Sequence, residues 1–287
     1  MSYSALIGKP TSHSVSHVMY GELAIAANLP QFYQHIRIDV EPEELERSLQ
    51  ALKTLHFIGL NVTLPYKLEV MQYVDELDTL AENLGAVNAI KLGQHTVGYN
   101  TDWAGITESV KQFGGHQHYE TATIFGTGGA ARAAIYACKQ LGIDNISVVY
   151  RAKDSGSTQG LQKQSMQLGI TLYPYSEAGS LVNKSRLIIN ATSAGMVGKD
   201  RLPFDLALIK DVSLKDKVFL DAVFNPLKTP LLAHFKTEGA ATIDGLWMMI
   251  YQGIKSLSIW FDAQIDISTD ELTKIHNLLE KEIEKNV

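Results

Sequence analysis

The sequence predicts an α/β protein of two domains, and three observations support that class. The chain has 287 residues, which is long for one simple hydrophobic core and sufficient for two domains of ordinary size. Short apolar runs alternate with stretches of helical pattern, as in parallel sheets with helical crossovers. A glycine-rich turn near mid-chain joins an apolar strand to an alanine-rich helix. A second structural unit is therefore expected to begin near Asp102.

The first hundred residues are typical of a mostly parallel sheet with crossover helices. The expected elements follow the apolar periodicity, with strands at 4–8, 32–40 and 57–64 and helices at 16–29 and 41–55. The second helix has Pro42 in its first turn and acidic residues near its positive end. Two further short segments, 85–93 and 95–100, are expected to pair as strands.

The remaining residues repeat the alternation of strand and helix. Strands are predicted at 121–125, 145–151, 186–190 and 217–224. Residues 126–142 are predicted to form a glycine-rich turn that runs into a helix, and further helices are predicted at 244–264 and 269–285. Gly142 is expected to end the helix that follows the glycine-rich turn. The stretch 153–160, "KDSGSTQG", has the composition of a loop.

Composition points to a soluble cytoplasmic protein without a nucleic-acid or membrane partner. The net charge is -6 and no long basic run occurs, so electrostatics give no reason to propose nucleic acid. The amino terminus lacks a signal-peptide pattern, and no segment offers the roughly 20 apolar residues of a membrane span. The single cysteine, Cys138, excludes an internal disulfide and is predicted to be a small buried hydrophobe.

The glycine-rich turn predicts a dinucleotide site. Gly126, Gly128 and Ala131 match the spacing G-x-G-x-x-A between a strand and a helix. Gly126 permits the tight turn, Gly128 lets the backbone approach a pyrophosphate, and Ala131 lets the helix pack closely on its strand. The amino end of the helix supplies unpaired N–H groups for the phosphates. The alternative is a glycine-rich connection that binds nothing.

The end of the following strand favours NADP over NAD. NAD sites usually place an acid there for the ribose 2′-hydroxyl, whereas NADP sites need cations for the 2′-phosphate. Here Arg151 and Lys153 follow the strand, and Asp154 comes late for a ribose contact. The alternative is that these residues are solvated loop charges.

Four groups of polar residues interrupt the apolar pattern of the first half, each at or just beyond the end of a predicted strand. They are Ser12–Ser16, Asn61–Lys67, Asn88 and Asn100–Asp102. Ligand sites of open α/β sheets form at the carboxyl ends of strands. Hydroxyls and amides both donate and accept, which suits a polyol, and clustered metal ligands are lacking, so no metal is expected. Lys67 is suited to neutralising a carboxylate or transferring a proton.

Each of these polar residues also has a purely structural explanation. Asn61 and Thr63 are suited to closing a turn, Ser14 and Ser16 to capping the next helix, and Lys67 to lying in solvent. Within "GLNVTLPYK", residues 59–67, the apolar side chains of Leu60, Val62 and Leu64 are expected to anchor a strand. Asn61 and Thr63 alternate away from them, and Pro65 is expected to end the strand.

Taken together, the motifs resemble one enzyme family. The runs are "IGKPTSHSVS", "NVTLPYK", "GAVNAI", "GYNTDWAG", "GTGGAAR", "INATSAGM", "DAVFNPLKTPLL" and "DGLWMMIYQG". Their order and approximate spacing resemble those of shikimate dehydrogenases over nearly the whole chain. The resemblance implies reversible, NADP-linked reduction of 3-dehydroshikimate to shikimate in aromatic amino-acid biosynthesis.

The resemblance also implies a domain division and a set of site residues. The substrate-binding catalytic domain would comprise 1–101 with helices 245–287, and the Rossmann NADP-binding domain 102–244. Lys67 and Asp102 match the catalytic pair. Substrate contacts carry over to Ser14, Ser16, Asn61, Thr63, Asn88, Phe224 and Gln252. Cofactor contacts carry over to Gly126, Thr127, Gly128, Gly129, Ala130, Arg151, Thr192 and Gly245, with Lys153 as the second cation.

The sequence departs from the family pattern at three places. His17 follows Ser16 where a proline is usual, Phe224 replaces a tyrosine that often contacts the substrate carboxylate, and Tyr150 precedes Arg151 where the family has asparagine. Three alternatives stay open. They are an NAD-dependent quinate/shikimate dehydrogenase, a dinucleotide-binding protein without turnover, and an enzyme for an amino-substituted shikimate. A monomer or a homodimer is expected.

Overall fold

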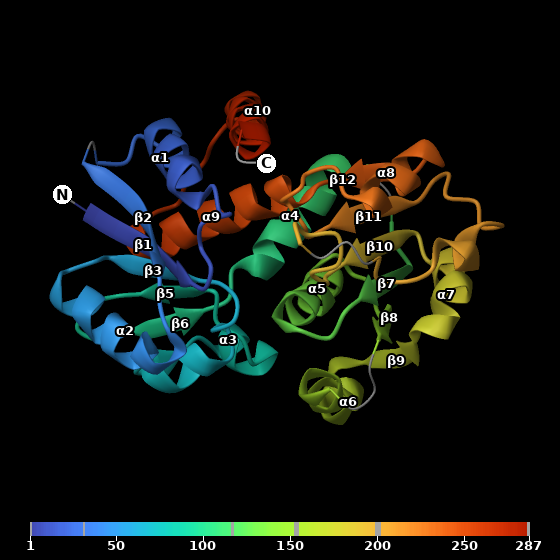
Figure 1. Cartoon of the computed structure of the whole chain (residues 1–287), viewed down its shortest axis with the longest axis horizontal. Helices are drawn as coiled ribbons and strands as arrows, with labels where there is room; N and C mark the ends of the chain where they lie inside the picture. Colours follow the sequence, from blue (N-terminus) through green and yellow to red (C-terminus); the bar gives the residue numbers. More distant parts are fainter. Residues whose placement is uncertain (1, 31, 116–117, 152–154, 199–201, 286–287) are drawn as a thin grey trace. The chain divides into compact units, whose positions relative to one another are not determined.

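The computed structural model describes residues 2–30, 32–115, 118–151, 155–198 and 202–285, and Figure 1 traces its elements along the chain. Contacts divide the chain into two units. One comprises Met1–Asp102 with Ile250–Val287, and the other comprises Trp103–Met249. The boundaries fall inside two helices, α4 (Asp102–Phe113) and α9 (Gly245–Phe261), so neither boundary coincides with a loop.

The first unit is built on a six-stranded sheet in the order β2-β1-β3-β5-β6-β4. Its strands are β1 (Ser2–Gly8), β2 (Tyr33–Asp39), β3 (Gly59–Val62), β4 (Glu76–Leu77), β5 (Ala89–Lys91) and β6 (Val97–Tyr99). β1 pairs in parallel with β2 and β3, and β5 is antiparallel to both of its neighbours. The predicted pairing of the two short strands is therefore confirmed.

Helices cover both faces of this sheet. The helical segments are α1 (Ser16–Ala26), η1 (Pro42–Glu44), α2 (Leu45–Thr54), η2 (Glu69–Tyr73), α3 (Thr79–Leu84), the carboxyl-terminal part of α9, and α10 (Thr269–Lys285). One core joins Ile7, Leu60 and Val62 of the sheet to the apolar residues of α2. The predicted helix at 41–55 begins as a 3₁₀ turn at Pro42 and becomes α-helical at Leu45.

The opposite face of the same strands carries polar and aromatic side chains. In the sheet register Ser4 lies beside His35, and Leu6 beside Asn61. Because successive side chains of a strand alternate in direction, these residues point away from the core that contains Ile7 and Leu60. His35 stacks there on Tyr20 of α1, whose ring also contacts Trp260 of α9.

Strand β3 differs from its prediction in two respects. It ends at Val62, and Leu64 is 55% exposed, so Leu64 does not anchor the strand. Asn61 is only 5% exposed although it alternates with the apolar residues. The reason is that helices cover both faces, and a strand covered on both sides buries its polar positions as well.

The second unit is a parallel sheet in the order β12-β11-β10-β7-β8-β9. Its strands are β7 (Thr121–Phe125), β8 (Asn145–Tyr150), β9 (Ile170–Pro174), β10 (Leu187–Asn190), β11 (Val218–Asp221) and β12 (Ala241–Ile243). Numbered from β7, this is the strand order of a Rossmann sheet, with the reversal between β7 and β10. The predicted fold class is confirmed, although the sequence pattern had not indicated β9 or β12.

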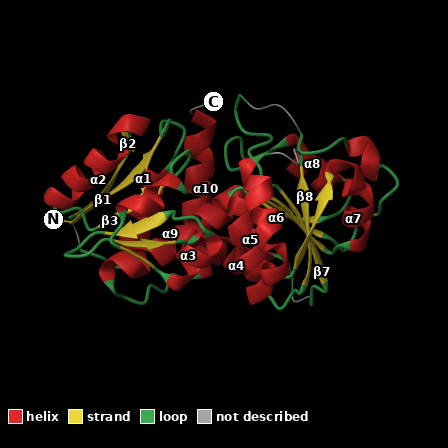
Figure 2. Cartoon of the chain, turned by 90° about the horizontal axis from the view of Figure 1, so that it is seen from below, coloured by secondary structure: helices red, strands yellow, loops and turns green. Residues whose placement is uncertain are grey.

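Helices lie on both sides of the second sheet: α5 (Gly129–Gln140) and α6 (Gly156–Leu168) on one, and α7 (Ala178–Lys184) and α8 (Pro230–Thr237) on the other, as Figure 2 shows. The prediction of a loop at 153–160 is wrong for 156–160, because α6 begins at Gly156. Ser155 caps this helix by accepting a hydrogen bond from the Thr158 amide at 3.2 Å. Residues 153 and 154 lie outside the described residues.

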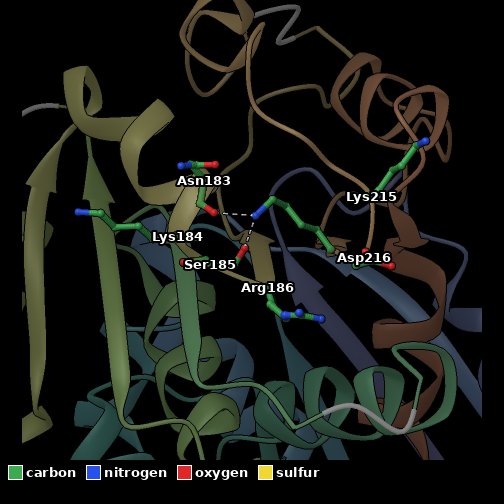
Figure 3. A pocket seen from close by; sticks show the side chains of 7 residues that line it. Asn183, Lys184, Ser185, Arg186, Lys215 and Asp216 are labelled. Atoms are coloured by element: carbon green, nitrogen blue, oxygen red, sulfur yellow. Dashed lines mark hydrogen bonds between the residues drawn. The ribbon is translucent and has the colours of Figure 1, made fainter.

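A cavity of about 240 Å³ in the second unit is lined by polar residues, one of which caps a helix (Figure 3). Lys217 donates to the carbonyl oxygens of Asn183 and Ser185, at 2.9 and 2.8 Å, and so satisfies the carboxyl end of α7. The side chains of Lys184 and Lys215 point away from each other, so these two ammonium groups do not converge on one position. Of the helices that the structure describes, none has the length and apolar character needed to cross a bilayer.

Candidate functional site

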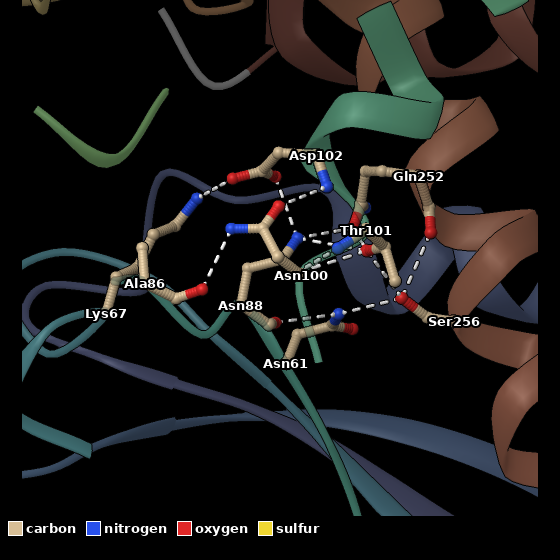
Figure 4. Close-up of polar contacts among 9 residues, drawn as sticks. All are labelled: Asn61, Lys67, Ala86, Asn88, Asn100, Thr101, Asp102, Gln252 and Ser256. Atoms are coloured by element: carbon tan, nitrogen blue, oxygen red, sulfur yellow. Dashed lines mark hydrogen bonds and ion pairs between the residues drawn. The ribbon is translucent and has the colours of Figure 1, made fainter. Parts of the chain in front are cut away.

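Lys67 and Asp102 form an ion pair in the first unit (Figure 4). The Lys67 Nζ lies 2.5 Å from the Asp102 Oδ2, with 20% of the lysine side chain and 6% of the aspartate side chain exposed. Lys67 follows a turn whose buried Tyr66 donates its hydroxyl to the Val40 carbonyl at 2.5 Å. Asp102 is the first residue of α4. Lys67 is therefore held at a fixed position and is not a solvated surface charge.

Asn88 orients the aspartate of this pair. Its amide nitrogen donates to the Asp102 Oδ1 at 2.7 Å, which leaves Oδ2 for the lysine. The side-chain oxygen of Asn88, Oδ1, accepts from the Thr101 main-chain amide at 2.6 Å, so both the nitrogen and the oxygen of the side-chain amide are fixed. Asn88 is 3% exposed. A buried network of this kind holds its members in one geometry because every alternative leaves a polar group without a partner.

Two residues of α9 complete the network. Thr101 donates to the Gln252 Oε1 at 3.2 Å, and its hydroxyl lies 3.1 Å from that of Ser256. Asn61 donates from its amide nitrogen to the Ser256 hydroxyl at 3.3 Å and to the main-chain carbonyl oxygen of Asn88 at 3.4 Å. The structure thus brings five predicted residues together, namely Lys67, Asp102, Asn88, Asn61 and Gln252 (Figure 4). Thr101, which lies within the predicted polar group Asn100–Asp102, belongs to the same network. Ser256 also belongs to it and was not predicted.

Two predicted substrate contacts have buried atoms without a partner. Among the described residues, neither the Asn61 Oδ1 nor the Ser16 Oγ meets a hydrogen-bonding group, and both atoms are buried. Leaving a buried polar atom unsatisfied costs about 1–3 kcal/mol, so such atoms mark places where a ligand or a water completes the site. The structural alternative, in which Ser16 caps the next helix, does not hold, because the N-cap of α1 is Val15 and the helix has no side-chain cap.

The serine loop, residues 11–14, is held by strand β2. Arg37 donates from Nη1 to the carbonyl oxygens of Ser12 and Ser14, at 2.9 and 2.6 Å. Asp39 accepts from the Thr11 amide at 2.7 Å and from the Thr11 hydroxyl at 2.5 Å. These hydrogen bonds from Thr11 lower the pKa of Asp39, and the charges of Lys9 and Arg37 lower it further. Neither Arg37 nor Asp39 was predicted as a site residue, because a charged residue in or near the end of a strand is a weak signal of function.

The arginine contact gives a first prediction. Replacing Arg37 by methionine should raise the KM for the substrate about threefold with little change in kcat, because two charge-assisted hydrogen bonds from this exposed arginine hold the loop that carries Ser14. Steady-state kinetics measure this. Arg47→Met, which removes an exposed arginine paired with Glu44, is the control. An unchanged KM in the Arg37 variant would show that the loop keeps its shape without the arginine.

The remaining predicted substrate residues are less constrained. Thr63 is half-buried, and its amide donates to the Ile7 carbonyl at 2.9 Å, which extends the ladder one residue past β3. Ser14 is half-buried and accepts from the Ser16 amide at 3.1 Å. Phe224 is half-buried and belongs to the second unit, where it follows β11. Its contact with a substrate stays a prediction.

The glycine-rich turn of the second unit fits a dinucleotide. Gly126 has φ +113°, and a Cβ there would lie 2.9 Å from the Ala191 carbonyl oxygen, so only glycine suits the turn. A Cβ at Gly128 would meet no atom within 4 Å, which leaves open space in front of the turn. α5 begins at Gly129, and its N-cap, Gly128, offers no side chain to its amide groups. These amides are the phosphate-binding groups of such folds.

The other predicted cofactor residues surround the same end of the sheet. Thr192 follows β10 beside Gly126, at the point where the strand order reverses. Its hydroxyl donates to the Asn190 Oδ1 at 2.7 Å and accepts from the Ala194 amide at 3.1 Å, so it also shapes its own loop. Arg151 is exposed after β8, and Gly245 begins α9. Lys153 lies outside the described residues.

Two further members of the turn have different surroundings. The Thr127 hydroxyl lies 3.1 Å from the hydroxyls of both Ser157 and Thr158, at the amino end of α6. Ala130 follows Gly129 in the first turn of α5 and is half-buried. Thr127 therefore joins the glycine-rich turn to the helix that follows β8.

Comparison with known proteins identifies the family. Residues 6–90 match the family model described as the shikimate dehydrogenase substrate binding domain. A shikimate dehydrogenase (NADP(+)) of Methanococcus aeolicus is 34% identical over 268 residues, which cover 92% of this chain and 93% of the relative.

Solved structures agree with the sequence relatives. A shikimate 5-dehydrogenase of Thermus thermophilus in complex with NADP(H) and shikimate has a TM-score of 0.80 at 27% identity, covering 93% of this chain and 95% of that one. A quinate dehydrogenase of Corynebacterium glutamicum in complex with NAD has a TM-score of 0.82 at 25% identity, covering 96% and 99%. The identity to the curated relative, sustained over nearly the full length of both chains, shows that this chain belongs to the shikimate dehydrogenase family.

Proposed function

We propose that this protein is an NADP-dependent shikimate dehydrogenase that reversibly reduces 3-dehydroshikimate to shikimate. The observation that carries the proposal is the Lys67–Asp102 pair, at 2.5 Å, in the unit whose buried Asn61 Oδ1 and Ser16 Oγ have no hydrogen-bond partner among the described residues. A proton carrier together with unsatisfied amide and hydroxyl groups is the chemistry that a ring of hydroxyls requires.

In the reductive direction Lys67 donates a proton from Nζ to the oxygen that becomes the new hydroxyl. In the oxidative direction the same amine takes the proton from that hydroxyl. Asp102 holds the ammonium group in place, and Asn88 holds Asp102. Asn61, Ser14, Ser16, Thr63 and Gln252 are assigned to the substrate's remaining hydroxyls and carboxylate.

When bound, NADP supplies or accepts the hydride. The residues that would hold it are the amides at the start of α5 for the phosphates, and Arg151 for the 2′-phosphate. Thr192 and Gly245 would line the same end of the second sheet. The relatives named for NADP(+) support this cofactor over NAD.

One assay tests the function and its nearest alternative. Purified protein is given shikimate or quinate, each with NADP⁺ or NAD⁺, and the absorbance of the reduced cofactor is followed. We expect the highest kcat/KM for shikimate with NADP⁺. Preference for NAD⁺ with quinate would replace the proposal by the quinate dehydrogenase activity named for the Corynebacterium structure. Cofactor binding without turnover on either substrate would support a binding protein that lacks activity.

The remaining assignments also stay predictions. We place the enzyme in aromatic amino-acid biosynthesis in the cytoplasm, as a monomer or homodimer. The thiol of its single cysteine, Cys138, is buried, and burial raises the pKa of that thiol to about 12, which keeps it unreactive.

A further inference from the structure

Tyr20 is a buried residue of α1, the helix that begins at the predicted substrate residue Ser16, and no role has been assigned to it. It is 1% exposed and follows Ser16 by one turn on the same face of α1. Its ring stacks on His35 with 4.2 Å between ring centroids and lies 5.3 Å from the ring of Trp260. The ring is therefore fixed, and the position of its hydroxyl follows from that packing.

The Tyr20 hydroxyl is buried and, within the described part of the chain, makes no hydrogen bond of acceptable geometry. The Asn61 Oδ1 is in the same condition. Asn61 alternates with the apolar residues of β3, so its side chain leaves the sheet on the face that α1 and α9 cover. A donor and an acceptor, each without a partner, therefore share one buried layer.

The electrostatics of this layer keep the tyrosine a donor. Burial raises the pKa of Tyr20, and interactions of its hydroxyl with Ser256, Asn61 and Gln252 counter part of that rise. Its neighbour His35 is uncharged, because burial and then the proximity of His17 lower the His35 pKa to about 3. The charge of Asp102 also raises the pKa of Tyr20, so the phenol keeps its proton and can donate it in a hydrogen bond.

We propose that Tyr20 is a positioning residue for substrate recognition, and that its hydroxyl donates to the Asn61 Oδ1 when the site is occupied. The inference rests on the proposed function. The two contacts of the Asn61 amide nitrogen, 3.3 and 3.4 Å, are long and do not lock the amide in one orientation. A hydrogen bond from the Tyr20 hydroxyl to the Asn61 Oδ1 fixes the orientation of the amide. The amide nitrogen of Asn61 is then directed toward a substrate oxygen.

A double-mutant cycle tests whether Tyr20 acts through Asn61. Tyr20→Phe should raise the KM for shikimate about fivefold with kcat within about twofold of wild type. Asn61→Ala should raise KM at least as much, and the double variant should match Asn61→Ala alone, because residues that act through one contact are not additive. Additive effects on KM, or an unchanged KM in Tyr20→Phe, would overturn the proposal.

Thermal unfolding supplies a readout that does not depend on turnover. Because the hydroxyl makes no hydrogen bond of acceptable geometry with the described residues of the free protein, Tyr20→Phe should keep the wild-type Tm without substrate. Saturating shikimate should raise its Tm less than it raises that of wild type, since ligand stabilisation follows affinity. A lower Tm without shikimate together with an undiminished shift would show a purely structural hydroxyl.

Two controls separate this inference from the proposed function. Tyr119→Phe removes another buried hydroxyl, which donates to the Gly114 carbonyl at 2.6 Å in the second unit, and should leave the KM for shikimate unchanged. Wild-type protein is assayed first. Absence of shikimate oxidation in wild type counts against the proposed function, whereas wild-type turnover with an unaltered Tyr20→Phe KM counts against Tyr20 alone.

Discussion

Replacing Lys67 by methionine is expected to lower kcat for shikimate oxidation by about 10²–10⁴-fold, the usual contribution of a positioned proton carrier, with the KM for shikimate changed by less than about threefold. Methionine keeps the length of the side chain and removes the proton-carrying group. The effect should fall on kcat because Lys67 is proposed to act on the hydroxyl that reacts, whereas the amides and hydroxyls around it are proposed to supply most of the binding. Steady-state kinetics at saturating NADP⁺ measure both constants.

A matched control exists in the same unit. Lys91 forms an ion pair with Asp262 at the surface, so Lys91→Met removes an equivalent charge away from the site and should leave kcat unchanged. If Lys67→Met kept substantial kcat, another group would be the proton carrier. If KM rose while kcat stayed intact, Lys67 would be a binding contact only.

Asp102→Asn is expected to lower kcat about 100-fold and to lower Tm. The asparagine carbonyl can still accept from Asn88, but its amide nitrogen then faces the Lys67 Nζ, and two donors meet where an ion pair stood. Removing one partner of a largely buried pair leaves the other uncompensated. Kinetics and thermal unfolding measure the two effects.

The comparison for this variant is Asp262→Asn, which breaks the exposed pair with Lys91 and should change neither quantity measurably. If the Asp102→Asn variant kept the wild-type kcat, Lys67 would be held in position without the Asp102 carboxylate. In that case Asn88 and the turn at Tyr66 would be sufficient to place it.

Local sequence features predicted much of the fold because their causes are local. The strand at 121–125, the turn at Gly126 and the helix after it each depend on neighbouring residues alone, and β7 and α5 lie as expected. Ser155 shows the limit of that reasoning. Its serine- and glycine-rich surroundings have loop composition, yet a single capping hydrogen bond starts a helix there.

The site was predictable where strand ends and family motifs coincide, and not where contacts come from distant segments. Lys67 and Asp102 were both marked by their motifs. Ser256 was not, because its part in the network depends on Asn61 and Thr101, which only tertiary packing brings to it. The prediction that Leu64 anchors the strand was wrong because local pattern alone was misleading there. Its apolar side chain suggested burial, but β3 ends at Val62 and Leu64 is exposed.

The bond between Asn61 and Ser256 joins residues 195 positions apart, and this separation has a consequence for biosynthesis. The sheet that carries Asn61 leaves the ribosome early, whereas α9 emerges only after the second unit has been made. Trp260, which donates to the Ile90 carbonyl at 3.0 Å, arrives equally late. Contacts of such long range are closed last. During translation the nascent amino-terminal sheet therefore has this face covered by α1 but not yet by α9, and a chain that ends before α9 cannot assemble this network.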